Sequence, residues 1–143
     1  MECAHFDAGR CGSCALLPIP RPQQVSDKVT QVRALLDPLG APEWFPPFTG
    51  RESGFRNKAK MVIGGSIESP TLGLLTADGT GIDLRDCGLY STRMHAVLPL
   101  LADFITLTAA IPYDVSARRG ELKHVLVTEA PSGAFMVRFV LRS

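Results

Sequence analysis

Residues 122–129 of the chain read LKHVLVTE and residues 134–142 read AFMVRFVLR, and these two stretches carry its clearest structural signal. Both are rich in β-branched and aromatic residues, which favour the pleated, half-buried surface of a sheet. Pro131-Ser132-Gly133 between them is typical of a tight turn. The pattern predicts a β-hairpin with strands over residues 122–129 and 134–142.

More strands are predicted upstream of this hairpin. Residues 56–63 alternate between charged and apolar side chains, which is the period of a half-buried strand. Residues 72–76 are predicted to pair with them across a turn region at residues 66–70. Residues 82–87 are interpreted as a short turn or strand end.

Two helices are predicted from apolar residues at helical spacing. The first covers Ser26–Leu36, with Ser26 as its N-cap and Pro38 ending it. The second covers His95–Ala109, with Pro99 near its first turn, where proline costs least. Their apolar faces comprise Val25, Val29, Val32, Leu35 and Leu36 in the first helix, and Val97, Leu98, Leu101, Phe104 and Ile105 in the second.

Together these elements predict an α+β fold, with a mostly antiparallel sheet, about two helices and a Cys-rich metal-binding segment at the N-terminus. The chain has 143 residues, of which 45% are hydrophobic and 20% charged, enough for a folded core. Residues 1–50 are predicted to form the metal-binding segment with one helix; within it, residues 1–23 are expected to be irregular. Residues 51–143 are predicted to form an α+β central domain that is incomplete, because its last strand runs into the end of the chain.

Charge and hydropathy exclude some classes of protein. The net charge is only +1, so any argument for nucleic-acid binding must rest on local patches. The start of the chain lacks the basic and apolar regions of a secretory signal, and no apolar run reaches the roughly 20 residues of a membrane helix. We therefore expect a cytoplasmic, monomeric protein without membrane contact. A reducing cytosol argues against structural disulfides.

The four cysteines are the candidate metal ligands. Their spacing is Cys3-x7-Cys11-x2-Cys14, followed after a long gap by Cys87. A Cys-x-x-Cys turn lets two thiolates converge on one centre, and four thiolates suit either tetrahedral zinc or an iron–sulfur cluster. Structural zinc sites usually pair two such turns, so the single turn here favours iron–sulfur without excluding zinc.

Two other interpretations of the cysteines exist. In the simplest interpretation, Cys87 is an ordinary buried thiol and the three N-terminal cysteines bind no metal, since buried single cysteines are common. A thioredoxin-type redox motif would need a helix starting within the Cys-x-x-Cys turn. Pro18, Pro20 and Pro22 argue against that helix.

Five stretches of the chain resemble a known family, the bacterial uracil-C5 methyltransferases that make 5-methyluridine in RNA. The resemblance is strongest to the 23S ribosomal RNA branch that lacks an extra N-terminal β-barrel domain. The stretches lie in the same order along the whole chain: residues 3–14 (CAHFDAGRCGSC), 54–62 (GFRNKAKMV), 83–90 (DLRDCGLY), 119–123 (RGELK) and 136–143 (MVRFVLRS).

This resemblance implies that Cys3, Cys11, Cys14 and Cys87 hold one 4Fe–4S cluster. The family transfers a methyl group from S-adenosylmethionine to uracil C5: a cysteine thiolate attacks C6, and a carboxylate base removes the C5 proton. No electron transfer is needed, so the implied cluster is structural. The implied partner is 23S ribosomal RNA.

The family's Gly-rich S-adenosylmethionine loop, Asn-Pro-Pro segment and catalytic cysteine have no match in this sequence. They belong to a Rossmann-like domain that is absent here, so we assign no catalytic residue and expect the chain alone to be inactive. The alternative function is a stand-alone iron–sulfur or zinc RNA-binding module. A ferredoxin is disfavoured because its ligands usually form a compact cysteine run.

Basic and aromatic side chains are candidates for RNA contact. The basic candidates, which could bind RNA phosphates, are Arg56, Lys58, Lys60, Arg118, Arg119 and Lys123. The alternative interpretation is that these residues form an ordinary solvated surface. The aromatic candidates, Trp44, Phe45 and Phe48, can stack on bases. Their proline-rich setting instead favours the prediction that they pin a loop to the core.

Overall fold

The structure is a computed structural model that describes residues 1–40 and 43–142. The chain divides into two compact units, residues 1–51 and residues 52–143. Residues 41 and 42 of the predicted 37–54 loop, and Ser143 at the end of the family resemblance, lie outside the described residues.

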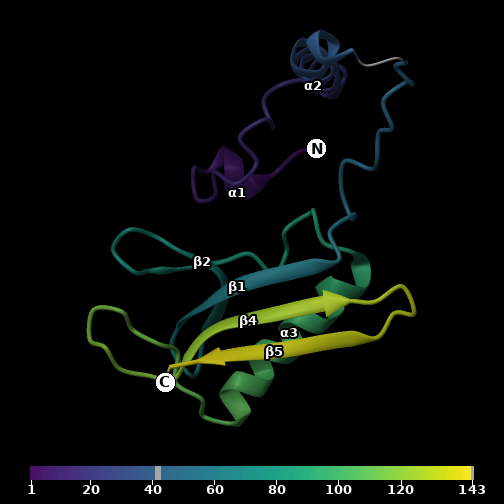
Figure 1. The fold of residues 1–143 in the computed structure, drawn as a ribbon. Coiled ribbons are helices and arrows are strands. Elements are labelled where there is room, and N and C mark those ends of the chain that lie inside the picture. The colour runs from purple at the N-terminus through teal and green to yellow at the C-terminus, as the bar shows by residue number, and fades with distance from the viewer. Residues whose placement is uncertain (41–42, 143) are drawn as a thin grey trace. The chain divides into compact units, whose positions relative to one another are not determined.

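The second unit is built on a five-stranded sheet in the order β3-β2-β1-β4-β5 (Figure 1). Every neighbouring pair is antiparallel. The fold is therefore α+β with an antiparallel sheet, as predicted. The strands are β1 (Lys58–Gly65), β2 (Pro70–Leu75), β3 (Gly81–Asp83), β4 (Leu122–Glu129) and β5 (Phe135–Leu141).

The predicted C-terminal hairpin is confirmed. Val125 of β4 lies opposite Phe139 of β5, and Val127 lies opposite Val137. In the turn, Gly133 has φ +85°, a conformation that favours glycine, and its N–H donates to the Ala130 carbonyl at 2.8 Å.

One face of the sheet is covered by α3 (Thr92–Leu107), as Figure 1 shows. Alternate residues of β1 and β4 point toward this helix, and with the buried side of α3 they form the core. Its fully buried side chains are Met61, Ile63, Leu72, Met94, Leu98, Ile105, Val125 and Val127.

The second predicted helix begins earlier than expected, at Thr92 instead of His95. Ser91 is its N-cap, and the Ser91 hydroxyl accepts a hydrogen bond from the Met94 N–H at 3.1 Å. Pro99 therefore lies inside the helix and not near its first turn. Its ring is on the exposed side, away from the core.

The first unit holds α1 (Ala4–Asp7), α2 (Arg21–Leu36) and the 3-10 turn η1 (Asp37–Leu39). The predicted helix thus begins five residues early, because Pro22 lies in the first turn, where a missing N–H costs nothing. The short α1 was not predicted. Gly40 ends η1 with φ +77°.

Candidate metal centre and nucleic-acid interface

The three N-terminal cysteines lie on the irregular chain around α1. Cys3 is the N-cap residue of α1, and its carbonyl accepts hydrogen bonds from the N–H groups of Phe6 and Asp7, both at 3.0 Å. The Cys11 N–H donates to the His5 carbonyl at 3.1 Å, and the Cys14 carbonyl accepts from Leu17 at 2.8 Å. Backbone hydrogen bonds therefore fix all three cysteines within a short segment.

Cys87 lies in the second unit, in the turn between β3 and α3. Its N–H donates to the Leu84 carbonyl at 3.1 Å, and its carbonyl accepts from the Tyr90 N–H at 3.0 Å. The His95 Nε2 atom is 2.9 Å from the same carbonyl. The half-buried Cys87 side chain packs against the core, so its position is set by a folded framework.

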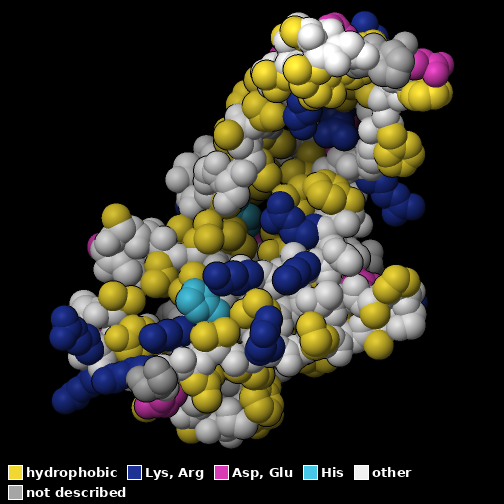
Figure 2. All heavy atoms as spheres, in the orientation of Figure 1, with side chains coloured by type: hydrophobic (Ala, Val, Ile, Leu, Met, Phe, Trp, Pro, Cys, Tyr) yellow, Lys and Arg dark blue, Asp and Glu magenta, His cyan; other side chains and the backbone are white. Residues whose placement is uncertain are grey.

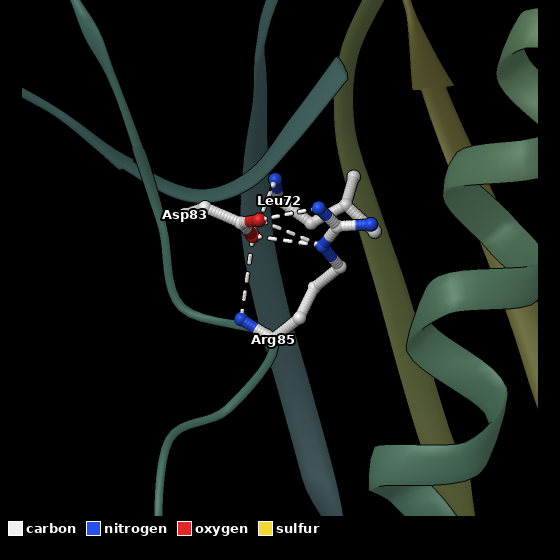
Figure 3. A network of polar contacts seen from close by, with 3 residues as sticks. All are labelled: Leu72, Asp83 and Arg85. Atoms are coloured by element: carbon white, nitrogen blue, oxygen red, sulfur yellow. Dashed lines mark hydrogen bonds and ion pairs between the residues drawn. The ribbon is translucent and has the colours of Figure 1, made fainter. Parts of the chain in front are cut away.

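An ion pair fixes the chain just before Cys87 (Figure 3). The Asp83 carboxylate accepts from the Arg85 guanidinium, with Nε 2.8 Å from Oδ2, and from the backbone N–H groups of Arg85 and Leu72. The hydrogen bond to Asp83 is the largest cause that raises the pKa of Arg85 above its usual value. The Asp83 carboxylate ties the cysteine-bearing turn to β2.

The donor chemistry of the four cysteines fits an iron–sulfur cluster, because none of them is in a disulfide and each side chain is half-buried. In the described residues, no three or more His, Cys, Asp or Glu side chains are gathered as a metal site. The assignment of a cluster to these cysteines therefore depends on their identity and their spacing in the sequence.

The sheet face opposite α3 carries basic side chains, and we call it the basic face. Lys58 and Lys60 of β1 alternate with the buried Ala59 and Met61, so they point away from the core. Lys60 lies opposite Leu126 of β4, and Leu126 lies opposite Arg138 of β5. Figure 2 shows Lys and Arg side chains grouped around a histidine over these strands.

His124 is the histidine of the basic face, placed opposite Val62 of β1 and Val140 of β5. Burial, followed by the positive charges of Lys60 and Lys123, lowers the pKa of His124 below its usual 6.5. The side chain is therefore neutral at pH 7. Sequence reasoning missed His124 and Arg138 as members of this face, because their position beside Lys60 follows from the register of β1, β4 and β5 and not from alternation within one strand.

The other basic candidates are spread around the sheet. Arg56 precedes β1 and is paired with Tyr90 in an isolated bridge. Arg118, with φ +52°, and Arg119 lie on the loop before β4. The Lys123 ammonium lies 4.9 Å from the centre of the Tyr113 ring, a cation–π contact. Of the six predicted residues, only Lys58 and Lys60 lie on the same strand with their side chains on the same, outward side.

The prediction that Trp44, Phe45 and Phe48 pin a loop to the core is wrong for the two phenylalanines. Phe45 is 76% exposed and Phe48 is 98% exposed. A proline-rich setting predicts a fixed backbone but does not determine which side of the chain meets solvent.

Among the helices of residues 1–40 and 43–142, none is long and apolar enough to cross a membrane.

No protein-family model matches the chain. Comparison with individual known proteins does find relatives, and those described below are all uracil-C5 methyltransferases of RNA. The chain is 49% identical over 144 residues to the 23S rRNA (uracil(747)-C(5))-methyltransferase RlmC of Escherichia coli O1:K1. The match covers 100% of this chain and 38% of that protein. The protein of the same name from Escherichia coli O139:H28 gives the same values.

A solved structure shares the fold. It is the crystal structure of Pyrococcus abyssi tRNA (uracil-54, C5)-methyltransferase in complex with S-adenosyl-L-homocysteine, with a TM-score of 0.72 and 19% identity over 93% of this chain and 32% of that one. The chain thus spans well under half of the length of the proteins it matches. Since 49% identity extends over its whole length, the chain belongs to the 23S ribosomal RNA uracil-C5 methyltransferase family.

Proposed function

We propose that this chain is the N-terminal, RNA-recognition and cluster-holding part of an S-adenosylmethionine-dependent enzyme that methylates uracil C5 in 23S ribosomal RNA. The observation that carries the proposal is the 49% identity to a 23S ribosomal RNA methyltransferase along the entire chain. The proposed site of modification is the one printed in that relative's name, uracil 747. The protein acts in the cytoplasm as a monomer.

In this proposal the basic face binds RNA phosphates. Lys58 and Lys60 project from the same side of one strand, and Arg138 projects from the same face two strands away. Residues two apart on a strand are separated by about 7 Å, so the cations form a spaced row instead of a single point charge. Arg56, Arg118, Arg119 and Lys123 extend the positive surface at its edges.

Apolar side chains between these cations suit the same role. Val62, Leu126 and Val140 are half-buried on the basic face, and Met136 is 62% exposed. Such a surface excludes water around the sugar and base edges while the lysines and arginine neutralise phosphates. A purely solvated strand face would not need this apolar content.

The four cysteines are proposed to hold the 4Fe–4S cluster as a structural element. Bound, the cluster would supply a covalent cross-link among residues 3, 11, 14 and 87. The thiols are then committed to iron, and none remains to attack uracil C6. The chain is thus proposed to position RNA and to leave methyl transfer to the rest of the enzyme.

The test is RNA binding by the purified chain, measured by fluorescence anisotropy against salt concentration. Each phosphate contact that is lost should reduce the slope of log K against log salt by about 0.7 for a single strand. Lys60→Gln should show this loss. Arg93→Gln, which removes a charge from α3 on the opposite side of the sheet, is the matched control and should not. Equal losses in the two variants would reject the basic face as the RNA surface.

A further inference from the structure

A groove on the first unit has no role in the function proposed so far. It lies between α2 and the segment after η1 and has a volume of about 440 Å³, within the size range of small-molecule sites. Its α2 side is formed by Lys28, Val29, Val32 and Arg33, and its other side by residues 44–47.

The wall formed by Trp44 is held in place from two directions. Its Nε1–H donates a hydrogen bond to Asp37 Oδ1 at 2.7 Å, which anchors the edge of the indole to η1. The Arg33 guanidinium carbon lies 4.9 Å from the ring centre, a cation–π contact. The indole is therefore a fixed platform, and the site requires little reorganisation to accept a planar group.

The groove is apolar and open, and Lys28 supplies a cation in its lining. None of the residues of α2 is buried, and Val32 is 44% exposed. Phe45 across the groove is 76% exposed. Lys28 and Arg33 lie on its α2 side, and two carboxylates stand nearby: Asp37 accepts from Trp44 at 2.7 Å, and Asp27 accepts from the Gln23 amide at 2.6 Å.

A ligand that matches these properties has a flat apolar part and a negative charge beside it. An unpaired nucleotide of RNA has both, since its base stacks on aromatic rings and on arginine, and its phosphate pairs with lysine. A base in a duplex is already stacked on both sides and cannot enter. Lys28 favours a ligand that carries a phosphate beside its flat part over an apolar protein segment, which would leave the Lys28 charge unmatched.

We propose that this groove is a base-stacking site for an unpaired nucleotide of the bound RNA. This inference rests on the proposed function and deepens it: the basic face holds the phosphate backbone, and the groove selects RNA that presents an unstacked base. Trp44 and Phe45 supply the stacking surfaces, while Lys28 supplies a phosphate contact.

The experiment uses the intrinsic fluorescence of Trp44, which is the only tryptophan in the sequence. The full 143-residue chain is titrated with a single-stranded hexauridylate RNA and with a six-base-pair RNA duplex. The single strand should quench Trp44 and the duplex should not. Phe45→Ala should weaken single-strand binding by about 5- to 150-fold, the range for loss of one base-stacking contact.

Phe48→Ala is the matched control, because Phe48 is the same residue type, 98% exposed and outside the groove lining. It should leave binding unchanged. Arg33→Lys keeps the charge but removes the planar guanidinium, and it should lower affinity while preserving the salt dependence.

Three results would overturn the inference. In the first, single-stranded RNA binds and Lys60→Gln weakens the binding, but the RNA neither quenches Trp44 nor requires Phe45. This result would reject the groove as a base-stacking site and leave the proposed function standing. Self-association abolished by Phe45→Ala, without quenching by RNA, would show that the groove binds protein. No binding to any RNA would reject both the groove and the proposed RNA-recognition role.

Discussion

The two units of the molecule differ sharply in what holds them together. In the second unit, side chains from β1, β2, β4 and α3 form a core that contains eight fully buried large residues. Among the described residues of the first unit, His5 alone is buried, at 8% exposure. Burial of apolar surface is the main favourable term in folding, at about 25 cal/mol per Å².

The comparison indicates why the proposed cluster would contribute most to the stability of the first unit. A segment of about 50 residues without a hydrophobic core usually needs disulfides, a metal or a partner to be stable. Three of the four cysteines of the chain lie in this unit, and none of them is in a disulfide. The second unit has a core of its own and does not need such support.

The largest expected effect comes from removing a proposed cluster ligand. Cys87→Ser should strongly reduce the hydrogen-exchange protection of residues 1–23 while the amides of β1 and β4 stay protected. Protein purified without oxygen should be compared with the variant by mass spectrometry. Unchanged protection of residues 1–23 would show that the first unit is stable without the cross-link.

A pair of leucine substitutions sharpens the comparison. Leu98→Ala in the core, where Leu98 is 0% exposed, should cost about 2–5 kcal/mol of unfolding free energy. Leu35→Ala in α2, where Leu35 is 72% exposed, should cost under about 0.5 kcal/mol. Denaturant unfolding, followed by circular dichroism, measures both. A similar cost at the two positions would mean that α2 is packed in the folded protein.

A smaller effect is expected at the N-cap of α3. Ser91→Ala removes the hydrogen bond to the Met94 N–H and should lower stability by about 1 kcal/mol. Ser91→Thr retains a hydroxyl and serves as the control, with most of the stability kept. If both variants were equally destabilised, packing around residue 91, and not capping, would be responsible.

The smallest effect concerns His124 of the basic face. Because its pKa is lower in the folded state than the usual 6.5, the unfolded chain binds more protons in the window just below that value. Stability should therefore fall slightly as pH drops from 6.5 through the folded pKa, and His124→Gln should remove this dependence. Melting temperatures between pH 7.5 and 5 measure it, with His95→Gln as a comparison.

How far the sequence predicts the structure depends on the range of the interactions involved. The hairpin β4–β5 and strand β1 were predictable because alternation and turn residues are local signals. The start of α2 was misplaced because Ser26 was assigned as its N-cap, although Pro22 is compatible with the first turn of a helix that begins at Arg21. The start of α3 was misplaced because Ser91, a good N-cap residue, was overlooked.

The candidate sites follow the same rule. Alternation predicts Arg56, Lys58 and Lys60 on one side of a strand. Lys58 and Lys60 lie there, since period 2 is a local property, whereas Arg56 precedes β1. The contribution of Arg138 to the same face depends on the register of three strands, which no local pattern gives. The exposure of Phe45 and Phe48 also could not be predicted, because it depends on what the rest of the chain leaves uncovered.

The most direct test of the proposed cluster is the metal content of the chain, purified without oxygen and never exposed to air. We predict a brown protein with broad visible absorption and about four iron atoms per chain, as a four-thiolate cubane cluster requires. The same preparation of Cys11→Ser should lose most of this iron. Stoichiometric zinc with no iron in the unsubstituted protein would contradict the account.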